Sequence, residues 1–133
     1  MASGQCLCGA VRFSLGVEPG FYYRCHCTLC RKQTGVGHNL ATLVNARDFR
    51  WEEGQEAITG WRKSTGYRND FCSRCGSTVP NVLRETPYFW IPLGLLDAEL
   101  SMVQIDIGAG YALALLCVLT AGILRFRSRS IRS

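Results

Sequence analysis

The amino-acid sequence predicts a mainly β domain followed by an atypical tail. Short apolar segments are separated by turns rich in glycine, of which the 133-residue chain has 14. No stretch before residue 100 carries an apolar stripe with the 3.6-residue period of a helix. The chain is long enough for one modest core, and a small sheet domain gains much of its stability from a bound metal. We expect this domain over residues 1–104 and the tail over residues 105–133.

The expected strands follow one another along the first 71 residues. Val11, Phe13 and Leu15 alternate with polar neighbours, which predicts the first strand. Gly54 and Gly60 are expected to end strands and so to separate the later ones from one another. Those later strands are expected at residues 21–25, 37–44, 49–51, 57–59, 61–65 and 67–71.

Seven of the eight cysteines gather in three clusters with the spacings C-x-C, C-x-C-x2-C and C-x2-C. Thiols spaced in this way suit tetrahedral zinc, which prefers thiolate ligands. Seven thiols exceed the four of one closed site, so we expect one four-sulfur site and one three-sulfur site with an open position. The spacing does not decide which clusters combine. The seven residues are Cys6, Cys8, Cys25, Cys27, Cys30, Cys72 and Cys75.

Local geometry favours the close pairs as ligands. Side chains two residues apart on a strand project from the same face, so Cys6 is expected to project with Cys8, and Cys25 with Cys27. Gly76 follows the C-x2-C pair, which is the form of a metal-binding turn with a left-handed residue.

Disulfides are the main alternative for these thiols, and the sequence disfavours them. Residues 1–20 contain no basic start followed by an apolar run, so we expect a cytoplasmic protein with reduced thiols. Seven is an odd number, and C-x-C pairs make strained bridges. Cys117 stands alone in an apolar run, where a small buried hydrophobic role is expected.

The charge of the domain argues against nucleic acid as a partner. The net charge is +5, but four of the 15 basic residues are arginines within residues 125–133. Without that segment eleven basic residues oppose ten acidic ones. The body is therefore nearly neutral, and we expect no nucleic-acid binding.

Three motifs carry a resemblance to a known family. They are GQCLCGAVRF at residues 4–13, CHCTLCRK at residues 25–32 and FCSRCGS at residues 71–77, with DFRW at residues 48–51 and Gly54 between them. In these motifs the chain resembles the glutathione-dependent formaldehyde-activating family, which also includes the centromere protein V domain. The resemblance covers roughly residues 3–100 and keeps all seven clustered cysteines in order.

The resemblance implies a fold, a pairing and an activity. The implied fold has small antiparallel sheets that meet at a tent-like angle around zinc. The implied closed, structural zinc site contains Cys6, Cys8, Cys72 and Cys75, and the implied second site contains Cys25, Cys27 and Cys30. The family joins formaldehyde to glutathione, which is a carbon–sulfur lyase reaction in the reverse sense.

The expected function is therefore that of a zinc-dependent enzyme acting on a small thiol and an aldehyde. A zinc ion with three thiolates is a weak Lewis acid, better suited to presenting a substrate thiolate than to making hydroxide. Cys25, Cys27 and Cys30 are the expected catalytic residues, and glutathione is the expected partner. The alternatives are a non-catalytic zinc-stabilised binding module and a redox sensor that releases zinc on oxidation.

Charged residues beside the C-x-C-x2-C cluster have two interpretations. Arg24, Arg31 and Lys32 are expected to offset the negative thiolates, and the alternative is that they hold the carboxylates of glutathione. His26 is expected to support the metal site without ligating the metal. His38 is expected to be a solvated or hydrogen-bonded residue, with proton transfer as the alternative.

The tail departs from the family. Residues 107–124 form a run of 18 residues without a charged side chain. Several arginines follow this run. As a helix this run would be about 27 Å long, close to a membrane core. A membrane anchor, a buried or oligomer-interface helix, and an altered gene end remain open as explanations. A membrane anchor would conflict with the usual topology. The arginines after the run should stay in the cytoplasm, and this would place the zinc domain on the other side of the membrane.

Overall fold

The computed structural model describes residues 1–97 and 103–107 and confirms a mainly β fold of small, largely antiparallel sheets. A three-stranded sheet has the order β1-β2-β5 and is antiparallel throughout. A separate antiparallel hairpin contains β6 and β7. The strands of the first sheet are β1 (Ala2–Gln5), β2 (Arg12–Leu15) and β5 (Phe49–Glu53), and those of the hairpin are β6 (Ile58–Arg62) and β7 (Arg68–Cys72).

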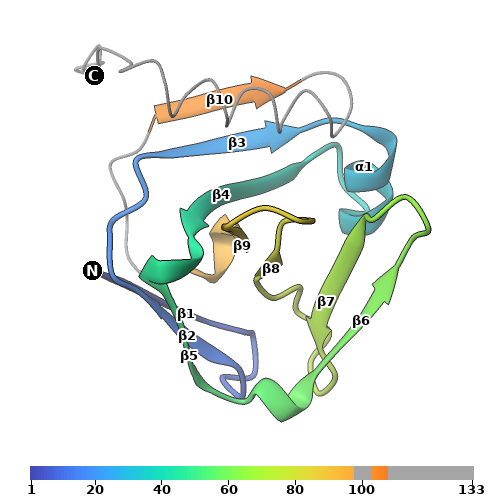
Figure 1. The fold of residues 1–133 in the computed structure, drawn as a ribbon. Coiled ribbons are helices and arrows are strands. Elements are labelled where there is room, and N and C mark those ends of the chain that lie inside the picture. The colour runs from blue at the N-terminus through green and yellow to red at the C-terminus, as the bar shows by residue number, and fades with distance from the viewer. Residues whose placement is uncertain (98–102, 108–133) are drawn as a thin grey trace.

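The largest sheet has five strands in the order β10-β3-β4-β9-β8. In Figure 1, β10, β3 and β4 of this sheet lie above the three-stranded sheet, and β10 lies along β3. The pair of β10 and β3 is parallel, and the other pairs of this sheet are antiparallel. In chain order its strands are β3 (Phe21–Cys25), β4 (Asn39–Asn45), β8 (Asn81–Val82), β9 (Tyr88–Pro92) and β10 (Val103–Ile107).

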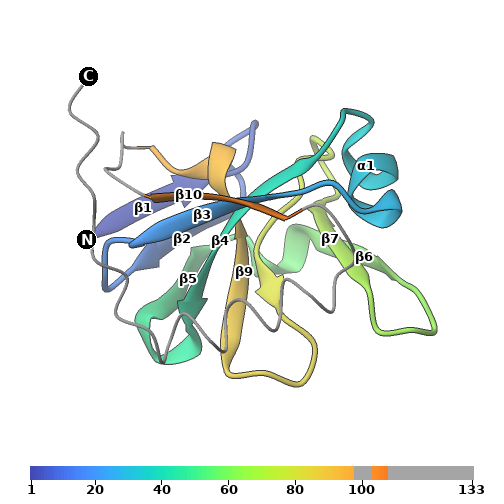
Figure 2. The same ribbon diagram turned by 90° about the horizontal axis from the view of Figure 1, so that it is seen from above.

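One α-helix, α1 (Thr28–Thr34), and three short 3-10 turns complete the described part of the chain. The turns are η1 (Ala46–Asp48), η2 (Gln55–Ala57) and η3 (Leu93–Leu95). The helix lies at the end of β3 and beside the hairpin in both views (Figures 1 and 2). It was not expected from the sequence, because only Cys30 of its seven residues is buried and so no apolar stripe marks it.

Buried residues form three clusters, and two of them contain the cysteines. One cluster packs Phe13, Leu15 and Ile91 between the three-stranded and five-stranded sheets. The second lies on the other side of the five-stranded sheet and includes Cys25 and Cys30. The third joins the turn after β1 to the hairpin and its members are Cys6, Val11, Ala57, Cys72 and Val79. Four of the described thiols are therefore part of the core, those of Cys6, Cys25, Cys30 and Cys72.

Glycines at two positions correct or explain the expected strand pattern. The strands expected on either side of Gly60 form one strand, β6, because Gly60 pairs with Asp70 across the hairpin. A Cβ on Gly60 would lie 2.5 Å from the Asp70 carboxylate, so glycine permits this pairing. Gly54 does end β5, with φ +82°. Its Cβ would lie 1.9 Å from the Ala10 carbonyl oxygen, so only glycine allows that contact.

Of the apolar run expected at residues 107–124, the structure describes one residue. Ile107, expected to begin an apolar helix, is the last residue of β10 and pairs with Cys25 of β3. Residues 108–124 lie outside the described part of the chain, as does Cys117. Among the described residues, no helix has the length and apolar character needed to cross a membrane. The division of the chain after residue 104 stays a prediction.

Candidate metal centres

Four cysteine thiols converge where the turn after β1 meets the end of β7. The Sγ atoms of Cys6, Cys8, Cys72 and Cys75 all lie within 4.8 Å of one another. The Cys6 and Cys8 sulfurs are 3.6 Å apart, and the Cys8 and Cys72 sulfurs are 3.9 Å apart. Sulfurs bound to one tetrahedral zinc at about 2.3 Å would be separated by about 3.8 Å. This group therefore could hold a metal ion.

Two turns, rather than strand alternation, bring these four thiols together. Cys6 follows β1, and its carbonyl accepts a hydrogen bond from the Gly9 N–H over 2.9 Å. In the same way the Cys72 carbonyl accepts from the Gly76 N–H over 2.8 Å. Gly76 has φ +77°, which confirms the expected left-handed residue after the C-x2-C pair. The expectation that Cys6 and Cys8 share a strand face was wrong, because the turn begins at Cys6.

Ser77 connects the two turns. Its hydroxyl accepts a hydrogen bond from the Leu7 N–H over 2.9 Å and lies 3.4 Å from the Cys75 sulfur. Hydrogen bonding from the side chain and backbone of Ser77 lowers the pKa of the Cys75 thiol to about 5. A thiol that ionises easily is a better metal ligand, because the metal binds the thiolate.

Three further thiols form a second group at the junction of β3 and α1. The sulfurs of Cys25, Cys27 and Cys30 lie within 4.8 Å of one another. Cys25 ends β3, and Cys27 is the N-cap of α1, where its sulfur accepts the Cys30 N–H over 3.4 Å. Cys25 and Cys30 are buried, while Cys27 is partly exposed. Three thiols occupy three corners of a tetrahedron and leave the fourth to another ligand.

The thiols of the second group influence one another. A hydrogen bond with the Cys30 thiol lowers the pKa of Cys25 to about 6, against the opposing effect of burial. The same interaction, together with burial, raises the pKa of Cys30. In the absence of metal this group therefore shares protons among its sulfurs, and a cation that binds three thiolates must displace them.

Two histidines lie beside the second group. The rings of His26 and His38 are 5.6 Å apart, centre to centre, with His26 exposed and His38 partly buried. The nearby His26 ring contributes to the lowered pKa of Cys25. Nothing in the local sequence pattern predicts that His38 lies here. The loop from α1 to β4 brings it back next to the C-x-C-x2-C cluster.

The basic residues near this group differ in position. Arg31 and Lys32 are exposed in the last turn of α1, where positive charge favours the helix dipole. Arg24 lies between Tyr23 and Cys25 on β3, so it projects from the opposite face of the sheet. Its Nε atom is buried and has no hydrogen-bond partner among the described residues.

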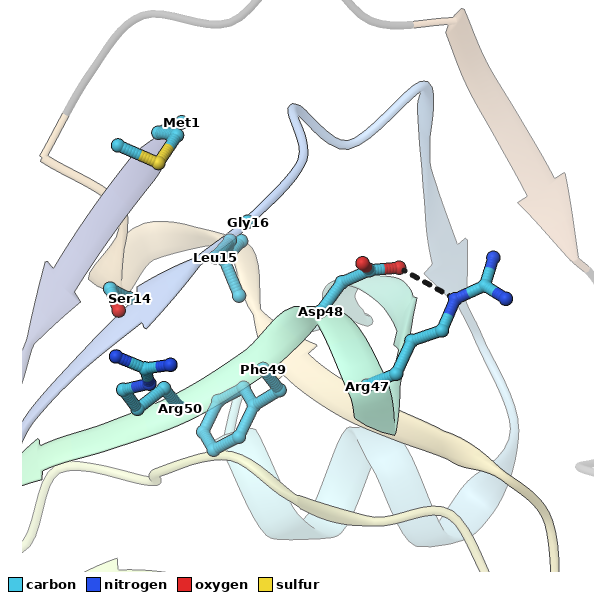
Figure 3. A pocket seen from close by; sticks show the side chains of 8 residues that line it. All are labelled: Met1, Ser14, Leu15, Gly16, Arg47, Asp48, Phe49 and Arg50. Atoms are coloured by element: carbon cyan, nitrogen blue, oxygen red, sulfur yellow. Dashed lines mark ion pairs between the residues drawn. The ribbon is translucent and has the colours of Figure 1, made fainter.

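A small polar cavity lies next to Cys30, and the sequence did not point to the residues around it. Its volume is about 10 Å³, and it is lined by Cys30, Gln33, Asn39, Tyr67, Arg68, Asn69 and Trp90. These side chains come from α1, β4, β9 and the start of β7. A larger hollow of about 240 Å³ is lined by residues of η1, β2 and β5 and by Met1, and contains no cysteine (Figure 3).

Comparison with known proteins agrees with this architecture. A crystal structure of a protein from Rhodobacter sphaeroides has the same fold, with a TM-score of 0.63 and 24% identity, and the match covers 77% of this chain and 99% of that one. A relative from Halomonas elongata, named "Putative glutathione-dependent formaldehyde-activating enzyme", is 35% identical over 86 residues, or 59% of this chain. The chain spans about half (54%) of the length of that relative. The family model described as "Glutathione-dependent formaldehyde-activating enzyme" matches residues 1–106, and the chain belongs to this family.

Proposed function

We propose that this protein joins formaldehyde to glutathione at the three-thiol group of Cys25, Cys27 and Cys30. Membership of the glutathione-dependent formaldehyde-activating family supports the substrates. The observation that carries the proposal is the number of thiols: three sulfurs within 4.8 Å of one another leave one corner of a tetrahedron for a substrate thiol.

We further propose zinc as the metal of both groups. An all-sulfur donor set selects zinc over the hard cations magnesium and calcium. The four-thiol group, Cys6, Cys8, Cys72 and Cys75, would hold a closed structural ion. At the three-thiol group, a bound zinc ion would lower the pKa of the glutathione thiol and so maintain it as a thiolate at neutral pH.

The chain's own residues would position the reacting groups. Cys25 and Cys30 are buried against the core, so the reacting centre has protein on one side and limited access for water. The glutathione sulfur attacks the formaldehyde carbon and forms the C–S bond. The thiol has released its proton to water before this attack. The electron pair of the C=O bond moves to oxygen, and that oxygen takes a proton back from water. The product is S-hydroxymethylglutathione, and the reverse sequence is the lyase reaction.

The test is the rate of exchange between glutathione and S-hydroxymethylglutathione, followed by NMR exchange spectroscopy because the reaction also occurs without protein. The zinc-loaded protein should accelerate this exchange, and Cys27→Ser should abolish the acceleration. Cys117→Ser is the matched control, because Cys117 belongs to none of the three cysteine clusters of the sequence. If the protein gives no acceleration at millimolar substrates, the proposed reaction is wrong.

A further inference from the structure

The cavity beside Cys30 is lined by Asn69, whose Nδ2 donor has no acceptor among the described residues. From this arrangement we infer that Asn69 donates a hydrogen bond to the aldehyde oxygen and stabilises its negative charge as the carbon–sulfur bond forms. This inference rests on the proposed function and names a residue outside the thiol groups. The argument depends on how the neighbouring side chains use their polar atoms.

Gln33 is the centre of the network around the cavity. It lies one helical turn after Cys30 on α1, so both side chains are on the same face of the helix. Gln33 Nε2 donates to Thr78 Oγ1 over 2.7 Å and to Asn69 Oδ1 over 3.3 Å. Gln33 Oε1 accepts from Asn39 Nδ2 over 2.7 Å. These three bonds connect α1 to β4, to β7 and to Thr78, which follows β7 in the chain.

The same network fixes the orientation of Asn69. Its Oδ1 atom faces the Gln33 donor, so its Nδ2 group is the free end of the amide. Nδ2 has no acceptor among the residues that the structure describes, although Asn69 is only partly exposed and lines the cavity. A donor that is positioned in advance and has no acceptor in the protein is what a developing oxyanion requires.

The cation of the cavity wall, Arg68, is already paired with a carboxylate. Arg68 donates from Nε to Asp70 Oδ1 over 3.1 Å and from its terminal nitrogen to Asp70 Oδ2. Asp70 is buried, so this bidentate pair has its charge neutralised within the hairpin. Asn69 lies between these two residues on β7 and therefore projects toward the opposite face, on the side of Gln33.

The size of the cavity matches a one-carbon aldehyde. A volume of about 10 Å³ is close to the minimum for a single water-sized group. The oxygen of formaldehyde can therefore occupy the cavity while its carbon remains next to the thiols. A methyl group added to that carbon, as in acetaldehyde, would need additional space next to Cys30. Tyr67 and Trp90, which are both buried, line the same cavity.

The experiment compares Asn69→Ala with the zinc-loaded wild type in the glutathione exchange assay. We expect the acceleration to fall by about 10²- to 10³-fold, the usual loss for one oxyanion donor, with zinc content unchanged. Asn69→Asp keeps the shape, removes the donor and should lose as much, so it serves if the alanine variant folds poorly. Asn45→Ala removes the same atoms from the far end of β4 and should keep full activity. A rate for Asn69→Ala within about twofold of wild type would overturn the inference.

A second measurement does not depend on activity. In ¹⁵N-labelled, zinc-loaded protein saturated with glutathione, the Asn69 side-chain NH2 signals should shift when formaldehyde is added, and those of Asn45 should not. If the wild type gives no acceleration but the Asn69 signals shift, the aldehyde site stands and the proposed reaction falls. If the exchange is accelerated and the Asn69 signals stay in place, the proposed reaction stands and the role of Asn69 falls.

Discussion

Replacing one cysteine in each thiol group should have unequal consequences, because the two groups occupy different places in the core. Cys72 has no exposed surface and packs with Cys6, Val11 and Val79. Cys72→Ser removes one of the four ligands of the proposed structural zinc site, and binding of zinc at such a site contributes on the order of 10–16 kcal/mol. The whole stability of a domain is about 5–15 kcal/mol. Cys72→Ser should therefore leave the protein unfolded or insoluble.

Cys27→Ser should lose one zinc ion and keep the fold. Cys27 is the N-cap of α1 and its sulfur accepts the Cys30 N–H. Serine is among the best N-cap residues, so its hydroxyl can replace this interaction. Cys27→Ala is the matched control: it should lose the same ion and an additional ~1 kcal/mol of stability, because alanine cannot cap the helix.

The assay is zinc content by mass spectrometry of the purified protein, together with urea denaturation followed by circular dichroism. Wild type should contain two zinc ions and Cys27→Ser one, with a native spectrum. The reasoning is refuted if Cys27→Ser retains two ions, or if Cys72→Ser unfolds at the same urea concentration as Cys27→Ser.

Three other predictions concern the fold and the protons of the thiols. Gly54→Ala should destabilise the domain by about 3 kcal/mol or more in urea denaturation, because its Cβ would overlap the Ala10 carbonyl at a left-handed position. Gly66→Ala is the control: its φ is also left-handed, at +92°, but its Cβ would meet only the Arg84 guanidinium, 3.7 Å away. This change should reduce stability by about 1 kcal/mol. Equal losses of stability in the two variants would show that the Ala10 contact is unimportant. A chain ending at residue 107 should bind two zinc ions. A chain ending at residue 100 lacks β10, which pairs with β3 up to Cys25, and should lose the zinc ion of the three-thiol group before the other ion. Equal zinc retention by both chains would contradict a role for β10. The apparent zinc affinity of the three-thiol group, measured by chelator competition, should fall with decreasing pH, because protons compete with the metal. A plot of the logarithm of this affinity against pH should become steeper by one proton below about pH 6, where Cys25 of the metal-free protein becomes protonated. An unchanged slope would contradict the lowered pKa of Cys25.

The strands predicted best from the sequence are those with a clear inner and outer face. β2 alternates buried Phe13 and Leu15 with more exposed neighbours, and the observed strand agrees with the prediction. The sequence predicts two strands in place of β6, because glycine often ends a strand. At Gly60 the missing side chain instead makes room for Asp70 of the paired strand. Such a contact depends on a residue ten positions away and leaves no mark on the local pattern.

The helix and the cavity show the other limits of the sequence. α1 is stabilised by its Cys27 cap and by the packing of Cys30. The residues that stabilise this helix are therefore the same cysteines that the sequence predicts as metal ligands. The thiol clusters were visible because their spacing is local. The cavity residues Gln33, Asn39 and Asn69 are common polar types from three separate segments, and only the folded chain brings them together.

Cobalt substitution tests the central proposal most directly, because sulfur-to-cobalt charge-transfer absorption counts thiolate ligands. Protein with cobalt in both groups should have seven thiolate bonds, four in one group and three in the other. Glutathione at millimolar concentration should add an eighth and raise this absorption by about one-seventh, and S-methylglutathione, which has no free thiol, should not. An unchanged spectrum on adding glutathione would contradict the open position at Cys25, Cys27 and Cys30 on which the proposed function depends.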